Sequence, residues 1–409
     1  MIDFPIVKIG ELIKSGEAEI QTGPFGTQLK ASDYSDHGYP VINVRNVGFG
    51  DIRTESLEFI DDRVAEKLPT HRLMQNDIVF GRKGAVERHG LITGAQEGWY
   101  QGSDCLRLRF NSSRVNPKFI SYFFRTQAHQ DWMMAVCAFG ATMASLNQDI
   151  VKLINVPVPP IDIQNKIVGL LFAYDDLIEN NKRRIALLEN MAEEIYREWF
   201  VRFRFPGWQE EEFEKGLPVD WSIKKLSDIL SLQYGKALKN EDRAEGSVPV
   251  YGSSGVVGFH NEALVERPGI IVGRKGNVGA IHWSDVAFYP IDTVYYVESD
   301  LSDHFLYYLL HSVNFINNDA AVPGLNRKQA YSNEVLVSKS GLIEQFEELV
   351  KPLYDQKKSL IKMNDNLEKT KNQLLPRLIS GKLSVENLDI QLPPSMQSDQ
   401  PDRADEAAA

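Results

Sequence analysis

Apolar side chains recur at alternating steps of four and three residues in a long stretch after residue 160. This heptad spacing predicts a helix with one apolar stripe that packs against another helix. Only Asn181 is polar within the stripe, and we assign to it the setting of helix register, which is a documented use of a buried polar residue. The stripe consists of Ile167, Leu171, Tyr174, Ile178, Asn181, Ile185, Leu188, Ala192, Ile195 and Trp199.

A second stretch, near the end of the chain, carries an apolar residue at every seventh position, namely Phe346, Leu353, Leu360, Leu367 and Leu374. We expect the other half of this stripe at the positions between them, which makes the second stripe more polar than the first. Those positions are Leu349, Gln356, Met363, Thr370 and Arg377. Pro352 lies inside the stretch and predicts either a kink or a helix that begins near it.

Each predicted helix has roughly 36 residues and would be ~54 Å long at ~1.5 Å per residue. A helix with one apolar stripe needs a partner, and each of these helices is the nearest candidate for the other because their stripes share one period. We interpret the pair as a spacer that holds two globular domains apart. The alternative is two ordinary bundle helices inside one compact fold, but such long seven-residue repeats favour the spacer.

The chain also repeats a short basic phrase. Residues 77–86, with the sequence DIVFGRKGAV, return as residues 269–278, with the sequence GIIVGRKGNV. In each copy a β-branched run precedes an Arg-Lys pair that has glycine on both sides, which predicts a strand that enters a tight basic loop. The repetition indicates two related domains.

Other segments recur in the same order in both halves of the chain. They are a glycine-bearing turn followed by lysine (22–30 and 234–239), a Pro-Val segment (39–45 and 248–254), an amphipathic helical stretch (119–124 and 305–310) and a small-residue loop that ends in asparagine (140–147 and 322–326). For the two asparagines, Asn147 and Asn326, a turn stabilised by the Asn side chain is favoured over contact with a ligand.

Composition narrows the class of protein. A chain of 409 residues with 43% hydrophobic content is expected to form two or three soluble globular domains. The only two cysteines, Cys105 and Cys137, lack the spacing of a zinc site and argue against a disulfide framework. No stretch approaches ~18 continuous apolar residues, and the N-terminus lacks the order of a signal peptide. We therefore expect no membrane insertion and a location in the cytoplasm.

The formal net charge of −11 argues against a protein that coats nucleic acid indiscriminately, because such binding requires the neutralisation of many phosphates. Any contact with DNA has to be local. Residues 386–409 contain six acidic residues and one arginine and lack a periodic apolar pattern, so the body of the protein is less acidic than the whole chain.

Two further phrases complete a resemblance to a known family. A Pro-rich segment followed by glutamine, VPVPPIDIQ at 156–164, leads into the first predicted helix, and LLPRLISGKL at 374–383 ends the second. The second helix entrance, 335–345, keeps the glutamine but lacks the prolines. With the order domain, helix, domain, helix, these phrases resemble the DNA-specificity subunits of type I restriction-modification systems over nearly the whole chain.

This resemblance implies an α+β fold, in which two target-recognition domains related by an internal repeat are separated by two long antiparallel heptad-repeat helices. On that basis we expect target-recognition domain 1 at 1–160, a first long spacer helix at 161–205, target-recognition domain 2 at 206–340, a second long spacer helix at 341–385 and an acidic, disordered tail at 386–409.

The resemblance also implies a division of labour in a prokaryotic phage-defence complex. Each recognition domain would read one half of a bipartite, asymmetric double-stranded DNA target, and the helices would set the spacing and dock two methyltransferase subunits. Restriction and translocase subunits would join that core. The chain itself would bind no cofactor and no metal, because S-adenosylmethionine, ATP and magnesium would act in partner subunits that methylate adenine or cleave DNA.

The residues of the basic loops support DNA reading independently of the resemblance. The glycines around Arg82 and Lys83, and around Arg274 and Lys275, permit positive φ and close backbone approach. Arginine offers a bidentate fork for a guanine edge or a phosphate, and lysine is better suited to phosphate. For one copy, a solvated hairpin turn would be the favoured alternative, but two matching copies favour function.

Further candidates follow from matching positions or from neighbouring basic loops. Arg45 and Asn46 follow a strand-like segment, and Arg88 and His89 follow the first basic loop. Taken alone, Arg45 is as well explained by ordinary surface charge. The candidates in the second half are Lys236, Tyr251, Ser253, Ser254, Asn277, Arg327 and Lys328.

Catalysis by this chain is not expected. We find no GxxxxGK[ST] nucleotide-binding motif, no convincing glycine-rich cofactor turn, and no Pro-Pro-aromatic strip of a methyltransferase, since Ile161 follows Pro159 and Pro160. Two other function classes stay open. A self-contained DNA-modifying enzyme would bind a cofactor by itself, and a duplicated protein scaffold would show no salt-sensitive affinity for DNA. Similarly, the net positive charge of 351–382 fits either a DNA backbone or an acidic protein partner.

Overall fold

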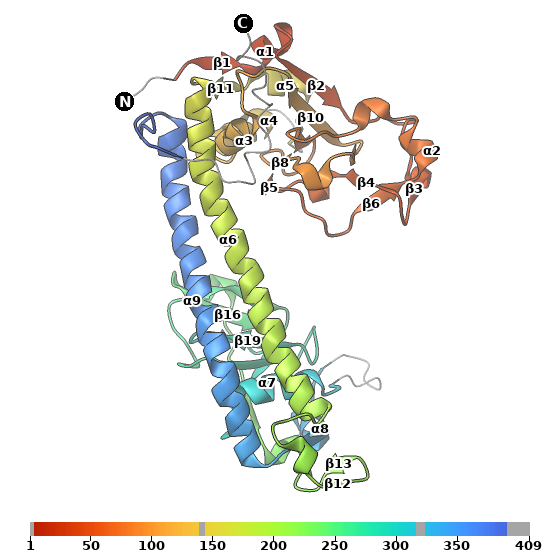
Figure 1. Cartoon of the computed structure of the whole chain (residues 1–409), viewed down its shortest axis with the longest axis vertical. Helices are drawn as coiled ribbons and strands as arrows, with labels where there is room; N and C mark the ends of the chain where they lie inside the picture. The colour runs from red at the N-terminus through yellow and green to blue at the C-terminus, as the bar shows by residue number, and fades with distance from the viewer. Residues whose placement is uncertain (1–3, 139–143, 316–323, 391–409) are drawn as a thin grey trace, which may run out of the picture. The chain divides into compact units, whose positions relative to one another are not determined.

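The computed structural model describes residues 4–138, 144–315 and 324–390 of the chain (Figure 1). These residues belong to two compact units. Unit 1 combines the chain up to residue 178 with the residues from 365 onward, and unit 2 consists of residues 179–364. Two long helices, α6 (Ile161–Tyr196) and α9 (Ser340–Ile379), each contribute residues to both units.

The described residues of unit 1 form three sheets. The largest has the order β2 (Ala18–Thr22), β10 (Cys105–Phe110), β7 (Ile78–Gly81), β8 (His89–Leu91) and β5 (Phe49–Gly50). The second has the order β3 (Tyr34–Ser35), β6 (Glu58–Ile60), β4 (Tyr39–Ile42) and β9 (Tyr100–Gln101), and the third pairs β1 (Ile6–Lys8) with β11 (Asn155–Pro157). The short helices are α1 (Ile9–Lys14), α2 (Asp62–Ala65), α3 (Pro117–Phe124), α4 (Gln127–Ala138) and α5 (Gln148–Leu153).

Unit 2 is built in the same way. Its main sheet has the order β15 (Ser231–Tyr234), β21 (Val294–Glu298), β18 (Gly269–Gly273) and β19 (Ile281–Ser284). The others are β17 (Gly255–His260), β16 (Val248–Gly252) and β20 (Tyr289–Pro290), then β14 (Ser222–Lys225) with β22 (Glu334–Val337), and β12 (Phe213–Glu214) with β13 (Leu217–Pro218). Its short helices are α7 (Asp303–His311) and α8 (Arg327–Ser332).

The repeated text of the sequence corresponds to a repeated strand order. The basic phrase contains β7 in unit 1 and β18 in unit 2, with its Arg-Lys pair directly after the strand, and each of these strands lies between two antiparallel neighbours. In each unit one smaller sheet also contains a parallel pair, β4 with β9 and β16 with β20. A parallel pair requires a crossover, so its presence at the same place in both units reflects common topology rather than local hairpins.

Helix α6 begins where the Pro-rich segment ends, and Gln164 explains why. The Gln164 side chain is fully buried. Its Nε2 donates to the carbonyl oxygens of Pro159 at 2.7 Å and Arg114 at 2.9 Å, while its Oε1 accepts from the Asn116 backbone N–H at 2.8 Å. One amide side chain therefore bonds to the backbone just before α6, at Pro159, and to the backbone just before α3, at Arg114 and Asn116, so this glutamine ties the helix entrance to the globular part of unit 1.

The helix boundaries differ slightly from the sequence expectation. Helix α6 ends at Tyr196 and continues as a π-helical turn, Arg197–Val201. Helix α9 begins at Ser340 and runs through Pro352 without interruption, so the expectation of a helix that begins near this proline is wrong. A proline removes one helical hydrogen bond, and its exposed position lets water replace that bond.

The stripe predicted for α6 is buried or half-buried along its whole length. For α9, the positions Phe346, Leu353, Leu360, Leu367 and Leu374 are likewise buried or half-buried, but the prediction for the positions between them is wrong. Leu349, Gln356, Met363, Thr370 and Arg377 are all exposed. The buried or half-buried positions lie one residue later, at Val350, Lys357, Asn364, Lys371 and Leu378.

The reason for this error is chemical. A seven-residue repeat can be completed by a step of three or by a step of four, and the sequence favoured the step of three because it contains Leu349 and Met363. The structure takes the step of four, which places three polar residues on the inner face of α9. They are tolerated because each has a polar partner on α6.

Both long helices complete the cores of the units. In unit 1, Ile167 and Leu171 of α6 belong to the same buried cluster as Leu378 of α9 and Phe119 of α3. In unit 2, Tyr196 of α6 and Phe346 of α9 share a cluster with Phe305 of α7. Within the described residues, no helix is long and apolar enough to cross a membrane.

Buried His129 predicts that the stability of unit 1 depends on pH. It packs against Phe123, Phe124 and Trp132, and burial lowers its pKa to about 4. The unfolded chain takes up this proton below pH ~6.5, whereas the folded protein does not until pH falls to about 4, so stability is lost as pH falls through that window. We expect a loss of about 2 kcal/mol between pH 6.5 and pH 5 from this residue.

The change to test is His129→Phe, which keeps the aromatic packing and removes the titrating group. Denaturant unfolding at pH 7.5 and pH 5 should show a smaller difference in the free energy of unfolding for this variant than for the unaltered protein. His37→Gln, at an exposed position, is the matched control. An unchanged difference in His129→Phe would contradict the assignment.

Candidate functional site

The two basic loops are held by the same backbone contacts. In unit 1, the Arg82 N–H donates to the Asp104 carbonyl at 2.8 Å, and the Arg82 carbonyl accepts from the Leu146 N–H at 2.8 Å. In unit 2, the Arg274 N–H donates to the Thr293 carbonyl at 2.9 Å, and the Arg274 carbonyl accepts from the Leu325 N–H at 2.8 Å. The backbone of each arginine is therefore hydrogen-bonded on one side to the residue directly before a neighbouring strand, β10 or β21, and on the other side to the small-residue loop.

The glycine after each Arg-Lys pair has the backbone conformation that the sequence suggested. Gly84 has φ of +76° and Gly276 has φ of +79°, in the left-handed region. A side chain would be strained there, because residues other than glycine rarely adopt this φ. Both loops therefore turn back sharply and leave the Arg-Lys pair at the bend.

Each lysine of the pair has an acidic neighbour. The Lys83 Nζ lies 3.3 Å from an Asp104 carboxylate oxygen, and the Lys275 Nζ lies 3.5 Å from an Asp292 carboxylate oxygen. All four side chains are about half exposed. Exposed pairs of this kind contribute little to stability, so the lysines can exchange these partners for another anion at small cost.

In unit 2 the loop arginine belongs to a cluster that sequence reasoning found only in part. The centre of the Tyr234 ring lies close to two guanidinium groups, 5.0 Å from that of Arg274 and 4.9 Å from that of Arg327. Arg274 also lies 5.7 Å from the ring of Tyr295. Such stacking holds guanidinium groups flat while their N–H groups stay available.

These residues line a hollow of about 650 Å³, together with Lys275, Gly276 and Asn326. Arg274 donates from Nη1 to the Asp292 carbonyl at 3.0 Å, and Arg327 donates from Nη1 to the Leu232 carbonyl at 3.2 Å. Two arginines and a lysine that converge on one hollow give it positive charge, which favours an anionic ligand. Neither Tyr234 nor Tyr295 was among the sequence candidates, although the turn 234–239 had been singled out.

Unit 1 has a simpler counterpart. The Arg82 guanidinium lies 5.3 Å from the ring of Phe25, which is exposed, and the Arg88 guanidinium lies 5.2 Å from the ring of Phe49. The loop arginine therefore stacks near a phenylalanine in unit 1 and near tyrosines in unit 2. The backbone hydrogen bonds that hold the loop arginine are common to both units, but the side chains around it differ.

The structure brings several other candidates together in unit 2. The Asn277 N–H donates to Ser253 Oγ at 3.4 Å, and Asn277 Nδ2 donates to Ser254 Oγ at 3.2 Å, so these three residues form one polar edge beside the basic loop. Lys236 and Lys328 are exposed. Tyr251 is instead buried, and its hydroxyl donates to the Trp283 carbonyl at 3.2 Å, which is the environment of a core residue.

The secondary candidates of unit 1 are less available. Arg45 pairs with Glu58 at 2.9 Å and donates to the Ser56 carbonyl, and Asn46 and His89 are buried. Burial lowers the pKa of His89 well below its usual value, which keeps the imidazole neutral. The contacts of these residues are structural, and Arg45 is already paired with an acidic side chain.

The two loop asparagines act as helix caps. Asn147 Oδ1 accepts from the Ile150 N–H at 2.9 Å, at the start of α5, and Asn326 Oδ1 accepts from the Lys328 N–H at 2.9 Å, at the start of α8. This confirms the expectation that their side chains stabilise local backbone. Residues 139–143 and 316–323 of the same two loops lie outside the described residues, as do residues 391–409 of the acidic tail.

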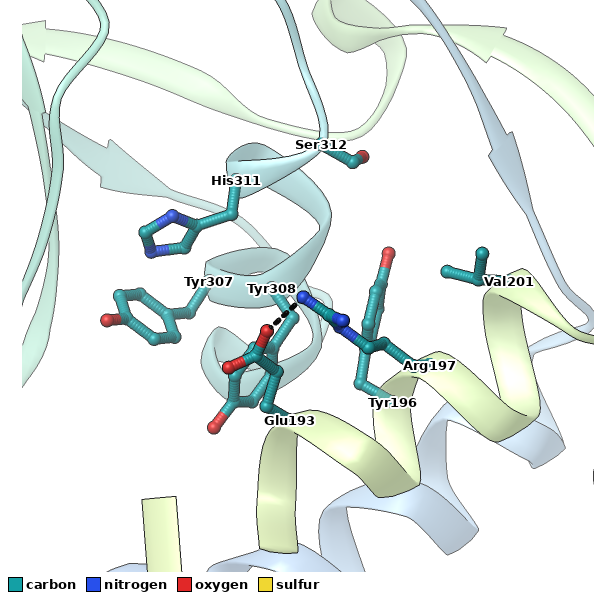
Figure 2. A pocket seen from close by; sticks show the side chains of 8 residues that line it. All are labelled: Glu193, Tyr196, Arg197, Val201, Tyr307, Tyr308, His311 and Ser312. Atoms are coloured by element: carbon teal, nitrogen blue, oxygen red, sulfur yellow. Dashed lines mark ion pairs between the residues drawn. The ribbon is translucent and has the colours of Figure 1, made fainter. Parts of the chain in front are cut away.

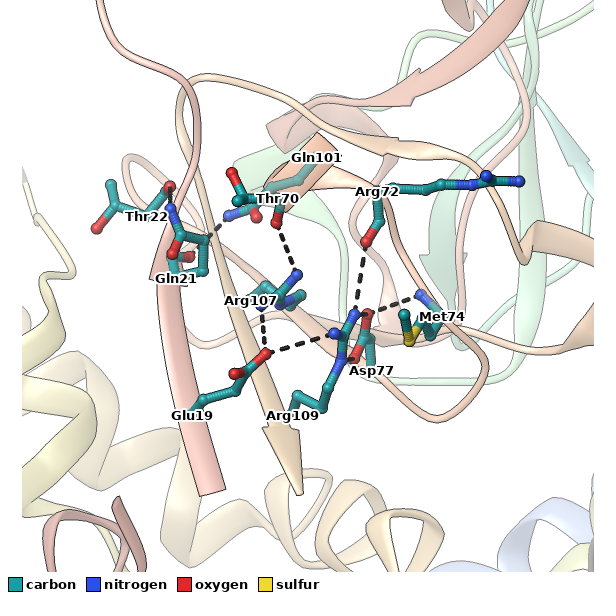
Figure 3. A network of polar contacts seen from close by, with 10 residues as sticks. All are labelled: Glu19, Gln21, Thr22, Thr70, Arg72, Met74, Asp77, Gln101, Arg107 and Arg109. Carbon is teal, nitrogen blue, oxygen red and sulfur yellow. Dashed lines mark hydrogen bonds and ion pairs between the residues drawn. The ribbon is translucent and has the colours of Figure 1, made fainter. Parts of the chain in front are cut away.

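A network of charged side chains around the buried Asp77 supports strand β7, which leads into the basic loop of unit 1 (Figure 3). The fully buried Asp77 carboxylate accepts from Arg109 Nε at 2.6 Å and Nη2 at 2.7 Å, and from the Met74 N–H at 2.8 Å. The hydrogen bonds to Asp77 raise the pKa of Arg109. Glu19 lies 2.6 Å from Arg107 and 3.4 Å from Arg109, so the network joins β2 and β10 to the start of β7.

Another cavity, of about 400 Å³, lies between α7 and the end of α6 (Figure 2). Figure 2 shows Arg197 directed toward Glu193, and their side chains form an ion pair of 2.6 Å. Tyr196 lines the same cavity, and burial raises the pKa of its hydroxyl. None of the sequence candidates lines it. Among the described residues, there is no group of three or more His, Cys, Asp or Glu side chains that could hold a metal ion.

Comparison with known proteins gives consistent matches. The family model described as the type I restriction modification DNA specificity domain matches residues 1–190 and 218–329. The type I restriction enzyme MjaIX specificity subunit of Methanocaldococcus jannaschii is 25% identical over 307 residues, which cover 67% of this chain and 71% of that protein. The MjaVIII specificity subunit of the same organism is 23% identical over 286 residues, which cover 61% and 67%.

Among solved structures, the S subunit of a type I restriction-modification system from M. genitalium has a similar fold. The TM-score is 0.59 and the sequence identity is 19%, and the match covers 92% of this chain and 96% of that one. At this identity the similarity concerns the fold alone.

The Asp77 network predicts a large loss of stability when its charge is removed. In Asp77→Asn, Arg109 keeps only the more distant Glu19 as an acidic partner in a largely buried position, and we expect a loss of about 3 kcal/mol in the free energy of unfolding. Glu179→Gln is the matched control, because it breaks an exposed pair with Arg183 and should cost about 0.5 kcal/mol or less. Denaturant unfolding of the full chain measures both, and equal losses would contradict a supporting role for Asp77.

Proposed function

Because this chain belongs to the family of type I restriction-modification DNA-specificity subunits, whose role is DNA target recognition, we propose that each of its two units reads one half of a bipartite, asymmetric double-stranded target. Specificity subunits are non-catalytic. The proposal concerns how this chain divides the reading, and which residues take part.

The observation that carries the proposal is that matching backbone hydrogen bonds hold the two basic loops in place. The same backbone contact, from a leucine N–H to the loop arginine carbonyl at 2.8 Å, holds Arg82 in unit 1 and Arg274 in unit 2. Two copies of one device suit two half-sites of one DNA target. The different surroundings of the two arginines then give the halves different sequences, because base choice depends on the geometry of the donors.

The chemistry of each loop suits a specific division of contacts. An arginine stacked on an aromatic ring presents its N–H fork in a fixed plane, which matches the two acceptors of a guanine edge or a phosphate. The half-exposed lysines suit phosphate, since a phosphate can replace their weak carboxylate partners. The acidic net charge of −11 restricts such binding to these local basic surfaces.

The two long helices are proposed to form an antiparallel, heptad-based spacer that sets the gap between the half-sites. Support comes from contacts inside each unit. In unit 1, Asp175 of α6 contacts Lys371 of α9, whereas in unit 2, Glu189, further along α6, contacts Lys357, which is earlier in α9. The order of partners runs in opposite directions along the two helices.

We further propose that the outer faces of these helices dock two methyltransferase subunits, and that restriction and translocase subunits join this core. Apolar side chains exposed on α6 and α9, such as Leu187, Met191 and Met363, support a protein partner there. In this proposal, S-adenosylmethionine, ATP and magnesium bind in the partners, which carry out adenine methylation and DNA cleavage.

The test is the pattern of adenine methylation in cells that express this chain with its cognate methyltransferase. We expect sequencing of modified adenines to show one split motif for the unaltered protein. Arg82→Ala should relax or abolish the reading of one half, and Arg274→Ala should do so for the other half. Loss of a base-specific arginine contact costs about 1–3 kcal/mol, which corresponds to roughly 5- to 150-fold less discrimination at that position.

Arg63→Ala and Arg204→Ala, which remove exposed arginines outside the basic loops, are the matched controls and should leave the motif unchanged. One continuous motif, or the same half affected by both loop variants, would contradict the division of reading between the units. The same motif in cells that lack this chain would contradict the proposed function altogether.

A further inference from the structure

The inner face of the helix pair contains polar side chains where an apolar residue would pack better. The central pair is Asn181 of α6 and Asn364 of α9, both buried, with Asn181 Nδ2 donating to Asn364 Oδ1 at 2.8 Å. Buried asparagines that bond to each other across two helices stabilise only the alignment in which they meet. This pair lies inside unit 2.

A second polar pair lies inside unit 1, about one heptad before Asn181 along α6. Lys371 Nζ of α9 contacts Asp175 Oδ1 at 2.7 Å. The other oxygen of Asp175 accepts from the Tyr122 hydroxyl at 2.7 Å and from Arg125 Nη1 at 3.1 Å. Burial alone would raise the pKa of Asp175, but Arg125 and Lys371 together lower it, so the carboxylate is held in its charged form.

The third pair lies inside unit 2, about one heptad after Asn181 along α6. Lys357 Nζ contacts Glu189 of α6 at 2.9 Å and Asp285 of the globular part at 3.4 Å. The lysine is buried, and Asp285 accepts a second hydrogen bond, from Trp283 Nε1 at 2.8 Å. Each outer pair therefore joins both helices to the globular part of its own unit.

We propose that these three polar pairs are register determinants, which allow the two helices only one alignment and thereby set the spacing between the DNA half-sites. The polar residues of α9 are spaced by seven, at Lys357, Asn364 and Lys371, and their partners on α6 run in the opposite order at nearly the same spacing. The step from register to DNA spacing rests on the proposed function. The register itself rests only on the helix contacts.

The order of the charges makes a displacement of α9 by one heptad unfavourable in either direction. A slide of α9 by one heptad in one direction would bring Lys371 to the position of Leu378 in the core of unit 1 and place Val350 opposite Glu189. A slide in the other direction would bring Lys357 to the position of Val350 in the core of unit 2 and place Leu378 opposite Asp175. Both slides bury an unpaired lysine, which is costly in an apolar core.

The displacement would be large on the scale of DNA. One heptad corresponds to ~10.5 Å along a helix at ~1.5 Å per residue. DNA rises ~3.4 Å per base pair, so this slide equals about three base pairs. An apolar stripe without the polar pairs would accept such a slide, because its seven-residue period repeats.

The experiment uses the full chain and replaces four residues of the polar pairs. These four are chosen because their replacement leaves no buried carboxylate without a polar partner. The variant combines Asn181→Leu, Asn364→Leu, Lys357→Met and Lys371→Met. Asp175 keeps Arg125 and Tyr122, Glu189 is half exposed, and Asp285 keeps Trp283. The matched control is Lys357→Arg with Lys371→Arg, which retains both charges.

Register is read by oxidative cross-linking of cysteines introduced at Ile185 and at one of three positions on α9. Four residues beyond Asn181, Ile185 is expected to face Leu360, which is four residues before Asn364. Leu353 and Leu367 are the positions displaced by one heptad. The native thiols give little background, because burial raises the pKa of Cys105 to about 12 and that of Cys137 to about 11.

With the polar pairs intact, and in the arginine control, only the cysteine at 360 should cross-link. In the four-residue variant, cross-links at 353 or 367 should also appear, while the melting temperature stays the same or rises because apolar side chains replace buried polar ones. A variant that still cross-links only at 360, or that melts at a lower temperature, would overturn the proposal, as would a displaced cross-link with the pairs intact.

The methylation pattern separates this proposal from the proposed function. A variant with displaced cross-links should also modify targets whose gap differs by about three base pairs. If the cross-links shift and the methylated gap does not, the register determinants stand and the proposed role of the helices in DNA spacing is wrong.

Discussion

The pairing of α6 with α9 is the constraint on which both units depend. Neither helix has a core of its own, because each carries one apolar stripe and must bury it against the other and against a globular part. Phe346 of α9 and Tyr196 of α6 belong to one buried cluster in unit 2, and Leu378 and Ile167 belong to another in unit 1. Unit 1 is therefore complete only when residues 365–390 pack against the N-terminal part of the chain.

On this framework the two units present one loop in two chemical settings. The backbone hydrogen bonds that hold Arg82 and Arg274 agree in length to within 0.1 Å. The surroundings differ, with Phe25 beside Arg82 and Tyr234, Tyr295 and Arg327 around Arg274. Under the proposed function, the common backbone contacts would direct both arginines at DNA in one geometry, and their different neighbours would let the two units distinguish two sequences.

Polar groups have two separate roles away from the loops. Asp77 is fully buried in unit 1, and its pair with Arg109, together with the pairs of Glu19 with Arg107 and Arg109, holds β7 against β10 and β2. The polar pairs lie between two helices whose seven-residue repeats would allow several alignments. The ion pairs of the sheet in unit 1 have no such alternatives to exclude. Apolar substitutes would strengthen the helix pair but leave its register open, so these pairs trade stability for uniqueness.

The two long helices, the repeat and the basic loops could be predicted from the amino-acid sequence, because each depends on local spacing. The heptad period of α6, the GRKG phrases and the glycine that turns each loop can all be identified from neighbouring residues. Contacts between side chains that are distant in sequence could not be predicted in this way, because they depend on how the chain folds in three dimensions. Tyr234, Arg274 and Arg327 come from three separate segments of the chain and meet only in the folded protein. Tyr251 lies at a position that matches the repeat, but its side chain is buried in the core. The same applies to the inner face of α9, where Asn364 is buried and the neighbouring Met363 is exposed. Asn364 bonds to Asn181 on a helix that is distant in sequence, and no local sequence pattern predicts that contact.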